Sequence, residues 1–542
     1  MNGNVVSVRS RHENGDSSRL HEVNGGPLHA FQPSEGTVSL DQMNIKHLEN
    51  RMQVLRQSLV DDIDAQLNSM MSEVIERLQE SNPKQNGYHK GASDHKQERK
   101  GGEKQFIPRN SYLTDLFKVN HIRTIYNIFA AMLLVLFLNT VVHDYIQTGT
   151  THVGLRTIKT GFGSVYDIVE IWMIMVASTF FIYLEFSLWA NKHNELAPKS
   201  ISRKIWDYAS LFVFITHQTL FIMVPAKLTI DKHFPAAAGI LVLMEQVRML
   251  MKTHAFVRSN VPRVLAYKPK DENSEASFYP QFSKFLYFMF APTFIYRDEY
   301  PRTKSIRWKV VMWNVAEILM IVFYVAFILE RFIIPPFEKY GPRIFEIQFV
   351  VLTVFSSMLP AIVMFLFGFY CILHACQNAM AELLRFADRQ FYKDWWNCTS
   401  FSAFYRTWNI PVHDWLHEYI YKDVHVKCHS KVFAIAMTFA VSALFHEYIL
   451  ALAFGFFYPV LFISFAGFSL LLVFLMKNYS KMDGNIYMWL ALIVGNGIVY
   501  TLYPMEFYAR SNCPPYSDHL LDSILPRSWI CHKISNDTSS VN

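Results

Sequence analysis

The stretch Ile125 to Val142, IYNIFAAMLLVLFLNTVV, decides what kind of protein this chain is. It contains no charged residue, and as a helix it would cover about 27 Å, close to the ~30 Å hydrocarbon core of a bilayer. The whole chain has the same character, since 51% of its 542 residues are hydrophobic, 15% are aromatic and only 18% are charged. We therefore expect a membrane protein, and the composition argues against a purely soluble enzyme.

Nine segments after residue 106 are long and apolar enough to cross a membrane. The sequence thus predicts an all-α, polytopic membrane protein with about nine transmembrane helices. Their approximate limits are 124–145, 164–190, 205–225, 233–253, 307–334, 344–370, 432–453, 457–476 and 484–504.

The first 106 residues contain neither Trp nor Cys and differ sharply from the rest. From Leu48 to Leu78 apolar residues recur every three or four positions, the pattern of a long amphipathic helix. Such a helix could assemble several chains into a homo-oligomer, a dimer or a tetramer, or lie on its own membrane domain. We expect a disordered tail over 1–41, the amphipathic helix over 42–82, a polar linker over 83–106 and a membrane domain over 107–542.

The distribution of positive charge predicts the orientation. No cleavable signal peptide opens the chain, so the tail should stay cytosolic. Every second connection between spans then faces the cytosol, and these connections carry most of the Lys and Arg, as the positive-inside rule requires. Nine spans place the C-terminus on the lumenal side.

The cysteines fit this orientation. Cys513 and Cys531 both fall in the lumenal tail and predict a disulfide, whereas the other four fall in or near a cytosolic stretch. No Cys or His spacing suggests a metal site. The net charge of +6 is modest and scattered, so we expect no nucleic acid as a partner.

Ionisable residues inside the predicted spans are the first candidates for chemistry, because a charge at membrane depth is costly. Glu245 and Arg248 are three residues apart and predict an internal ion pair. His217, beside Gln218, fits a packing residue. The full set is Glu170, His217, Glu245, Arg248, Glu317, His446 and Glu447.

His446 lies in the motif SALFHEY, Ser442 to Tyr448. Ser442 and His446 share a helix face, while Glu447 points about 100° away. The imidazole could be catalytic, or it could be structural and bonded to a backbone carbonyl.

The preceding cytosolic segment is rich in aromatic and polar residues. It contains FYKDWWN, Phe391 to Asn397, and FYRTWNIPVHDW, Phe404 to Trp415. Adjacent tryptophans at a membrane edge are usually an interfacial belt. Here they alternate with cations and amides, so the segment could also receive a polyanionic head group such as that of CoA.

Together, FYKDWWN, TWN and SALFHEY resemble the signature of the membrane-bound O-acyltransferase superfamily, in its sterol and diacylglycerol acyltransferase branch. FAPTFIYRDEYPRT, Phe290 to Thr303, resembles the sterol O-acyltransferases more closely. HIRTIY, His121 to Tyr126, and EQVRMLMKTHAFVR, Glu245 to Arg258, point the same way. The likeness covers about residues 106–531.

This resemblance implies a catalytic pair. His446 would be the general base on a sterol 3β-hydroxyl, and Asn409 would orient or polarise the acyl carbonyl. His121 would lie near a sterol site. The residues implied to contact acyl-CoA are Trp395, Tyr405, Arg406, His413, Tyr421, Lys431 and Ser442.

The resemblance further implies an endoplasmic reticulum enzyme that esterifies cholesterol or a related sterol with long-chain acyl-CoA. Acyl-CoA would be a co-substrate, and we expect no bound cofactor. A diacylglycerol acyltransferase is the second enzyme hypothesis, since FYxDWWN and the histidine are shared. A channel or transporter is a third, weakened because no internal repeat is found.

Overall fold

The computed structural model describes residues 104–151, 154–163, 165–267, 278–338, 346–476, 481–516 and 519–529. The chain divides into two compact units, Met1–Glu98 and Arg99–Asn542, and all the described residues belong to the second. The predicted tail, the amphipathic helix over 42–82 and nearly all of the linker lie outside the described residues. Those three predictions therefore stay predictions.

The described part of the chain is helical, and its secondary structure includes no β-strand beyond two isolated bridges. Seven of its helices are long and apolar enough to cross a membrane, which confirms a multi-pass membrane protein. They are α3 (Asn120–Thr148), α5 (Val165–Glu195), α6 (Ile201–Asp231), α9 (Trp308–Ile328) with its extension η2 (Leu329–Ile333), α10 (Ile347–Phe369) with η3 (Tyr370–Cys376) and α11 (Gln377–Leu383), α15 (Lys431–Phe454) and α18 (Lys481–Asn512).

The other two predicted spans also fall on helices. The span predicted over 233–253 belongs to α7 (Ala236–Ala266), which carries several charged residues. The span predicted over 457–476 is a shorter helical run over residues 460–475. It consists of α16 (Val460–Phe462), η6 (Ile463–Ser469) and α17 (Leu470–Leu475). The count of nine spans remains a prediction.

Short helices connect the long ones and carry most of the sequence motifs. They are α2 (Tyr112–Leu116), α4 (Leu155–Phe162), α8 (Phe282–Phe290), η4 (Trp395–Asn397), α12 (Phe401–Trp408), α13 (Ile410–Leu416), η5 (His417–Tyr421), α14 (Lys422–Cys428), α19 (His519–Ile524) and η8 (Arg527–Trp529).

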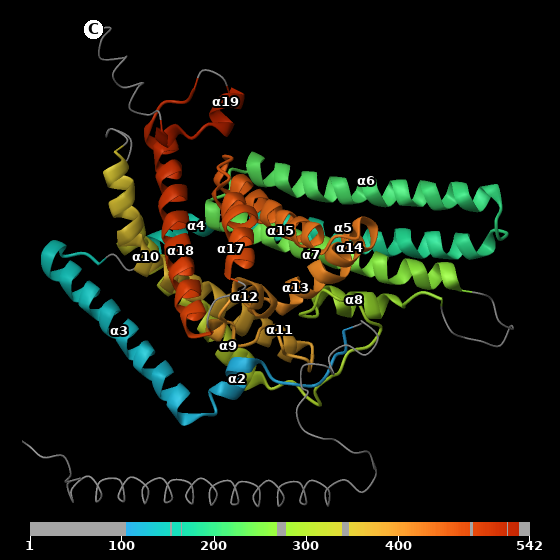
Figure 1. Cartoon of the computed structure of the whole chain (residues 1–542), viewed down its shortest axis with the longest axis horizontal. Coiled ribbons are helices and arrows are strands. Elements are labelled where there is room, and N and C mark those ends of the chain that lie inside the picture. Colours follow the sequence, from blue (N-terminus) through green and yellow to red (C-terminus); the bar gives the residue numbers. More distant parts are fainter. Residues whose placement is uncertain are drawn as a thin grey trace, which may run out of the picture. The chain divides into compact units, whose positions relative to one another are not determined.

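Helices α5, α6 and α7 pack side by side, and α15 packs against α6 and α7 (Figure 1). Helix α18 packs along α10. The largest cluster of buried side chains joins α5, α7 and α8 to the FYKDWWN motif and α12. The core is therefore built where the FYKDWWN motif meets the helix bundle.

Charged groups on α7 are paired, as the sequence predicted for Glu245 and Arg248. Arg248 Nε donates to Glu245 Oε2 at 2.6 Å, and Trp172 Nε1 donates to Glu245 Oε1 at 3.0 Å. Lys252, 1% exposed, donates to the carbonyl oxygens of Phe288 and Ala291 at 2.6 and 2.5 Å. The amine of Lys252 thus meets carbonyl oxygens at the C-terminal end of α8.

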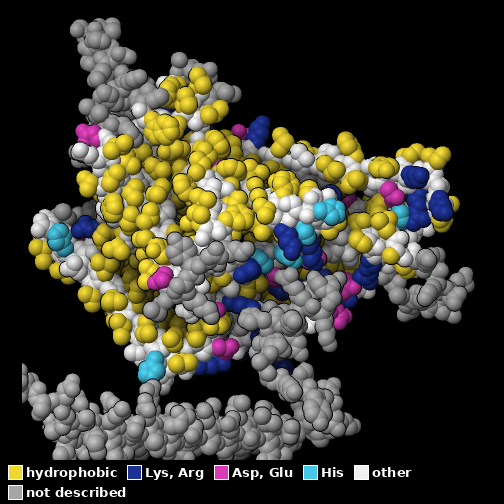
Figure 2. Space-filling view, viewed as in Figure 1, with side chains coloured by type: hydrophobic (Ala, Val, Ile, Leu, Met, Phe, Trp, Pro, Cys, Tyr) yellow, Lys and Arg dark blue, Asp and Glu magenta, His cyan; other side chains and the backbone are white. Residues whose placement is uncertain are grey.

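Hydrophobic side chains cover α10, α17 and α18 on the face shown in Figure 2. Leu352 and Leu359 on α10 are 69% and 72% exposed, as expected of a helix whose solvent is lipid. Charged and histidine side chains gather instead over α13 and α14 and at the right-hand end of the α5–α6 hairpin.

The described cysteines do not test the predicted sidedness, which stays a prediction. The thiols of Cys371, Cys376, Cys398 and Cys428 are free. Cys513, at the end of α18, is 6% exposed. Cys531 lies outside the described residues, so its pairing with Cys513 stays a prediction.

Candidate active site

The two motifs that flank Asn409 are hydrogen-bonded to each other through the backbone. Lys393 N donates to Thr407 O, and Ile410 N donates to Phe391 O, both at 2.9 Å. In the sequence Asn409 lies between Thr407 and Ile410, the two residues of its own motif that make these bonds. The FYKDWWN segment therefore fixes the position of Asn409, although the two motifs are separated in the sequence.

Asn409 itself is the N-cap of α13. Its Oδ1 accepts a hydrogen bond from Val412 N at 3.3 Å, and Pro411 occupies the first turn. The amide nitrogen Nδ2 has no hydrogen-bond partner among the described residues. Asn409 thus combines a structural role, through its oxygen, with a donor available to a substrate.

Trp395 is the centre of an aromatic cluster and is 1% exposed. Its ring lies 4.7 Å from that of Trp408 and 5.0 Å from that of Phe369, both edge-on. Asn485 and Trp489 on α18 donate to the carbonyl oxygen of Trp396, which ties the motif to that helix. The structure gives Trp395 a packing role, and its contact with acyl-CoA stays a prediction.

His446 lies on α15 with one ring nitrogen anchored. Its Nδ1 is 2.7 Å from the carbonyl oxygen of Ser442, one turn earlier. Because a carbonyl only accepts, Nδ1 carries the proton, and a neutral ring leaves the Nε2 lone pair free. Among the described residues Nε2 has no partner. The side chain thus has the tautomer that a general base needs.

Two neighbouring residues fix the rotation of α15 about its axis. Glu447 is 3% exposed and accepts from Tyr503 Oη at 3.0 Å and from Phe462 N at 3.1 Å. Tyr448 Oη donates to Gln246 Oε1 on α7 at 2.8 Å. With Glu447 and Tyr448 held on these sides, His446 faces η6.

Phe465 on η6 connects His446 to the Asn409 region. Its ring stacks on the imidazole at 4.7 Å between centroids and lies 6.3 Å from the ring of Tyr405 on α12. Tyr405 is one turn before Asn409. Burial raises the pKa of Tyr405 to about 12, so its hydroxyl stays protonated. The imidazole of His446 and the rings of Phe465 on η6 and Tyr405 on α12 thus form one aromatic cluster.

Helix α15 borders open space although it packs against α6, α7, η5, η6 and α16. Its described buried residues are Ala434, Ala443, Glu447 and Ala453 only. The His446 side chain is exposed, so its ring can be approached from outside α15. An apolar substrate could reach Nε2 from there.

Arg406 and Lys431 are exposed cations at the two ends of this region. Arg406 lies in the last turn of α12, and Lys431 is the first residue of α15. Neither forms an ion pair or hydrogen bond with other described residues. Both are available for phosphate groups, as the acyl-CoA prediction requires.

His413 and Tyr421 belong to a stack along α13, η5 and α14 that we did not predict. The rings of His413 and His417 are stacked at 6.1 Å, those of His417 and Tyr421 at 5.2 Å, and those of Tyr421 and His425 at 5.7 Å. The spacing of four residues was readable from the sequence. His417 and His425 therefore join His413 and Tyr421 as candidate residues of the functional site.

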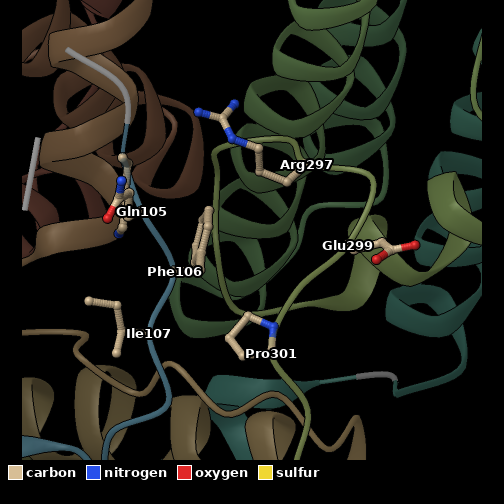
Figure 3. A pocket seen from close by; sticks show the side chains of 7 residues that line it. Gln105, Phe106, Ile107, Arg297, Glu299 and Pro301 are labelled. Atoms are coloured by element: carbon tan, nitrogen blue, oxygen red, sulfur yellow. The ribbon is translucent and has the colours of Figure 1, made fainter. Parts of the chain in front are cut away.

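Asp414 connects this stack to the segment that precedes α2. Lys104 Nζ donates to Asp414 Oδ2 at 2.5 Å. Burial alone would raise the pKa of Asp414, but hydrogen bonds from His413 and Lys104 lower it to about 2. Next to this pair, Phe106, Arg297 and Pro301 line a surface pocket of about 450 Å³ (Figure 3).

His121 is exposed in the first turn of α3. Helix α3 is well separated from α15 in Figure 1. The structure does not bring His121 together with His446, and its sterol contact stays a prediction. In the described residues no group of three or more His, Cys, Asp or Glu is arranged to hold a metal ion.

Comparison with known proteins identifies the family. The model of the membrane-bound O-acyltransferase family matches residues 208–504. Sterol O-acyltransferase 1 of Cricetulus griseus is 41% identical over 437 residues, which is 80% of this chain and 79% of that protein. Sterol O-acyltransferase 2 of Homo sapiens is 36% identical over 493 residues, 89% of this chain and 91% of that protein. With the family model covering more than half of its length, the chain belongs to the membrane-bound O-acyltransferase family.

Proposed function

We propose that this enzyme transfers the acyl group of long-chain acyl-CoA to the 3β-hydroxyl of cholesterol or a related sterol. The observation that carries the proposal is the anchored and exposed imidazole of His446, whose Nε2 has no partner among the described residues, in a chain similar to sterol O-acyltransferases. The similarity supports a sterol rather than diacylglycerol as acceptor.

In the proposed reaction His446 Nε2 accepts the proton of the sterol hydroxyl as its oxygen attacks the thioester carbonyl. The oxyanion that forms would accept a hydrogen bond from Asn409 Nδ2. Collapse breaks the carbon–sulfur bond, and the CoA sulfur takes the proton back from His446. General base catalysis typically contributes about 10²- to 10⁴-fold, and an oxyanion donor about 3 kcal/mol.

Direct transfer fits the state of Cys398, the cysteine that follows the FYKDWWN motif. Burial raises the pKa of the Cys398 thiol. Its Sγ lies 3.3 Å from Thr407 Oγ1. A protonated thiol is a poor nucleophile at neutral pH. An acyl-enzyme on Cys398 is thus not favoured.

The cellular setting belongs to the same proposal. We place the enzyme in the endoplasmic reticulum membrane with a cytosolic N-terminus, a lumenal C-terminus and a Cys513–Cys531 disulfide. Residues 42–82 would hold a homo-oligomer together. Deleting residues 1–82 should then lower the particle mass measured by light scattering, and an unchanged mass would refute that role.

An esterification assay tests the proposed activity. Purified full-length protein would receive labelled oleoyl-CoA with either cholesterol or diacylglycerol, and the products would be separated by chromatography. We expect steryl ester, with at least tenfold less triacylglycerol. Triacylglycerol as the main product would assign the enzyme to the other acceptor, and no ester with either would refute acyl transfer to these lipids.

A further inference from the structure

Lys104, in the segment before α2, forms an ion pair with a residue 310 positions later in the chain. Its Nζ donates to Asp414 Oδ2 on α13. The side chains of Lys104 and Asp414 are only 21% and 15% exposed. Neither was predicted from the sequence as a site residue. Asp414 nevertheless directly follows His413, which the family resemblance implies to contact acyl-CoA.

The segment that carries Lys104 is itself fixed to the rest of the protein. Arg109 N donates to Ala387 O at 2.9 Å, and Arg109 Nε donates to Asp388 Oδ1 at 2.7 Å. Both acceptors lie a few residues before the FYKDWWN motif. The chain before α2 is therefore tied to the loop that leads into this motif.

Aromatic packing fixes the same segment closer to Lys104. The ring of Phe106, at the centre of Figure 3, lies edge-on 5.0 Å from the ring of Tyr300 and 6.2 Å from that of Phe386. Lys104 Nζ lies 5.2 Å from the centroid of the Phe106 ring, a cation–π distance. The ammonium group is thus held by a ring on its own segment and by a carboxylate on α13.

Asp414 and its neighbour Trp415 hold α13 in two directions. Trp415 is 7% exposed, and its Nε1 donates to Met251 O on α7 at 2.9 Å. Successive residues of a helix point about 100° apart. With Asp414 bonded to Lys104 and Trp415 bonded to α7, α13 cannot rotate about its axis without breaking one of these bonds.

The direction of the His413 side chain depends on this arrangement. His413 Nδ1 lies 3.6 Å from Asp414 Oδ1, and its ring stacks on that of His417 at 6.1 Å. Asn409, at the other end of α13, is fixed separately by the backbone bonds of its neighbours to the FYKDWWN motif. Loss of Lys104 should therefore disturb His413 more than Asn409.

Lys104 could instead bind a phosphate group of acyl-CoA directly, because it lines a surface pocket together with Arg297. Its ammonium group, however, already donates to Asp414. This carboxyl stays ionised at neutral pH, because hydrogen bonds from His413 and Lys104 outweigh burial and lower its pKa to about 2. A phosphate would compete with this carboxylate for the ammonium group, so an indirect role is favoured.

We propose that Lys104 is a positioning residue for acyl-CoA binding, which holds α13 through Asp414 so that His413 can contact acyl-CoA. The inference rests on the proposed acyl transfer. It gives the segment before α2 a part in substrate binding that the sequence motifs do not assign to it.

Equilibrium binding and steady-state kinetics of the full-length protein test this role. The binding probe is labelled CoA carrying an oleyl thioether, which cannot transfer its chain. Lys104→Met should raise the Kd of the probe and the KM for oleoyl-CoA at least fivefold, with kcat within twofold of the wild type. Lys104→Arg restores a cation for the carboxylate and should keep both constants within twofold. An unchanged Kd in Lys104→Met would refute the role.

A double-mutant cycle separates positioning from direct contact. If Lys104 acts only through Asp414, the double variant Lys104→Met/Asp414→Asn should bind the probe no more weakly than the weaker of the two single variants. Losses that multiply in the double variant would show that Lys104 contacts acyl-CoA itself, and would overturn the positioning role.

Lys118→Met is the matched control. Lys118 pairs with Asp115 at 2.7 Å, but its side chain is 68% exposed, and such a surface pair contributes little. Its Kd and KM should equal those of the wild type, and an equal rise in this variant would attribute the effect to net charge and overturn the role of Lys104. A wild type that does not bind the probe would refute acyl-CoA as the substrate. Tight binding by both the wild type and Lys104→Met would refute the positioning role alone.

Discussion

His446 on α15 and His217 on α6 are both imidazoles within membrane-spanning helices, and each has a serine as a partner. His446 is bonded to the carbonyl oxygen of Ser442, which leaves Nε2 free. His217 is bonded through both nitrogens, to Ser178 and Glu185. Only the first ring can take a proton from a substrate without losing a bond. The number of occupied nitrogens, rather than membrane depth, separates the candidate base from a histidine whose two nitrogens are both bonded within the protein.

Replacing His446 should have the largest effect. His446→Ala and His446→Gln should each lower steryl ester turnover at least 100-fold, about 2.7 kcal/mol, because both lack a base at Nε2. Gln keeps a donor for the Ser442 carbonyl and so controls for the lost anchor. Rates would be normalised to folded protein from thermal unfolding. Retention of a tenth of the wild-type rate by His446→Gln would exclude the base role.

Asn409 allows its two roles to be separated. Asn409→Asp keeps the oxygen that caps α13 but removes the Nδ2 donor, whereas Asn409→Ala removes both. We expect a fall in kcat of at least 20-fold in both variants, with little change in acyl-CoA KM. Only Ala should also lower the unfolding temperature, because losing an N-cap costs about 1 kcal/mol. A normal kcat in Asn409→Asp would refute the oxyanion role.

The exposed cations should have smaller effects, on binding rather than chemistry. Arg406→Ala and Lys431→Ala should raise the KM for acyl-CoA about three- to tenfold with nearly unchanged kcat. The KM of each variant should also depend less on salt than that of the wild type, since a charge facing phosphate is lost. Kinetics at two ionic strengths would measure both. An unchanged KM in both variants would place the CoA phosphates elsewhere.

Cys398 should matter least. Cys398→Ser should retain near-normal turnover, because direct transfer needs no thiol and the serine can keep the contact with Thr407. Steryl ester formation and mass spectrometry of the quenched protein provide the measurements. A trapped acyl thioester on Cys398 in the wild type would replace direct transfer by a two-step mechanism.

Much of the fold was predictable because it depends on patterns within single helices. Seven of the predicted spans coincide with long apolar helices. A long apolar run can be recognised in the sequence without knowing which other segments it contacts. The Glu245–Arg248 pair was predicted because both residues lie on one helix. The limits of α7 were missed at its C-terminal end, where Arg258 and Arg263 interrupt the apolar pattern and pair with Asp423 and Asp298 from other segments.

The sites were less predictable because they depend on contacts between distant segments. Which way the His446 side chain faces follows from the rotation of α15, which Tyr503 and Gln246 fix from two other helices. His217 forms its hydrogen bonds with Ser178 and Glu185 on α5, and the sequence alone led us to interpret it as a packing residue. The cap at Asn409 did have a local signal, an asparagine followed after one residue by proline.

The central claim, that His446 removes a proton from the acceptor, is tested most directly by changing the acidity of that proton. Purified wild type and His446→Ala would receive acyl-CoA with either a 3β-hydroxy sterol or the matching 3β-thiol. A thiol is far more acidic than an alcohol and needs less help from a base. We predict that the loss caused by His446→Ala, at least 100-fold with the alcohol, shrinks at least tenfold with the thiol. Equal losses with both acceptors would show that His446 positions the substrate and does not remove its proton.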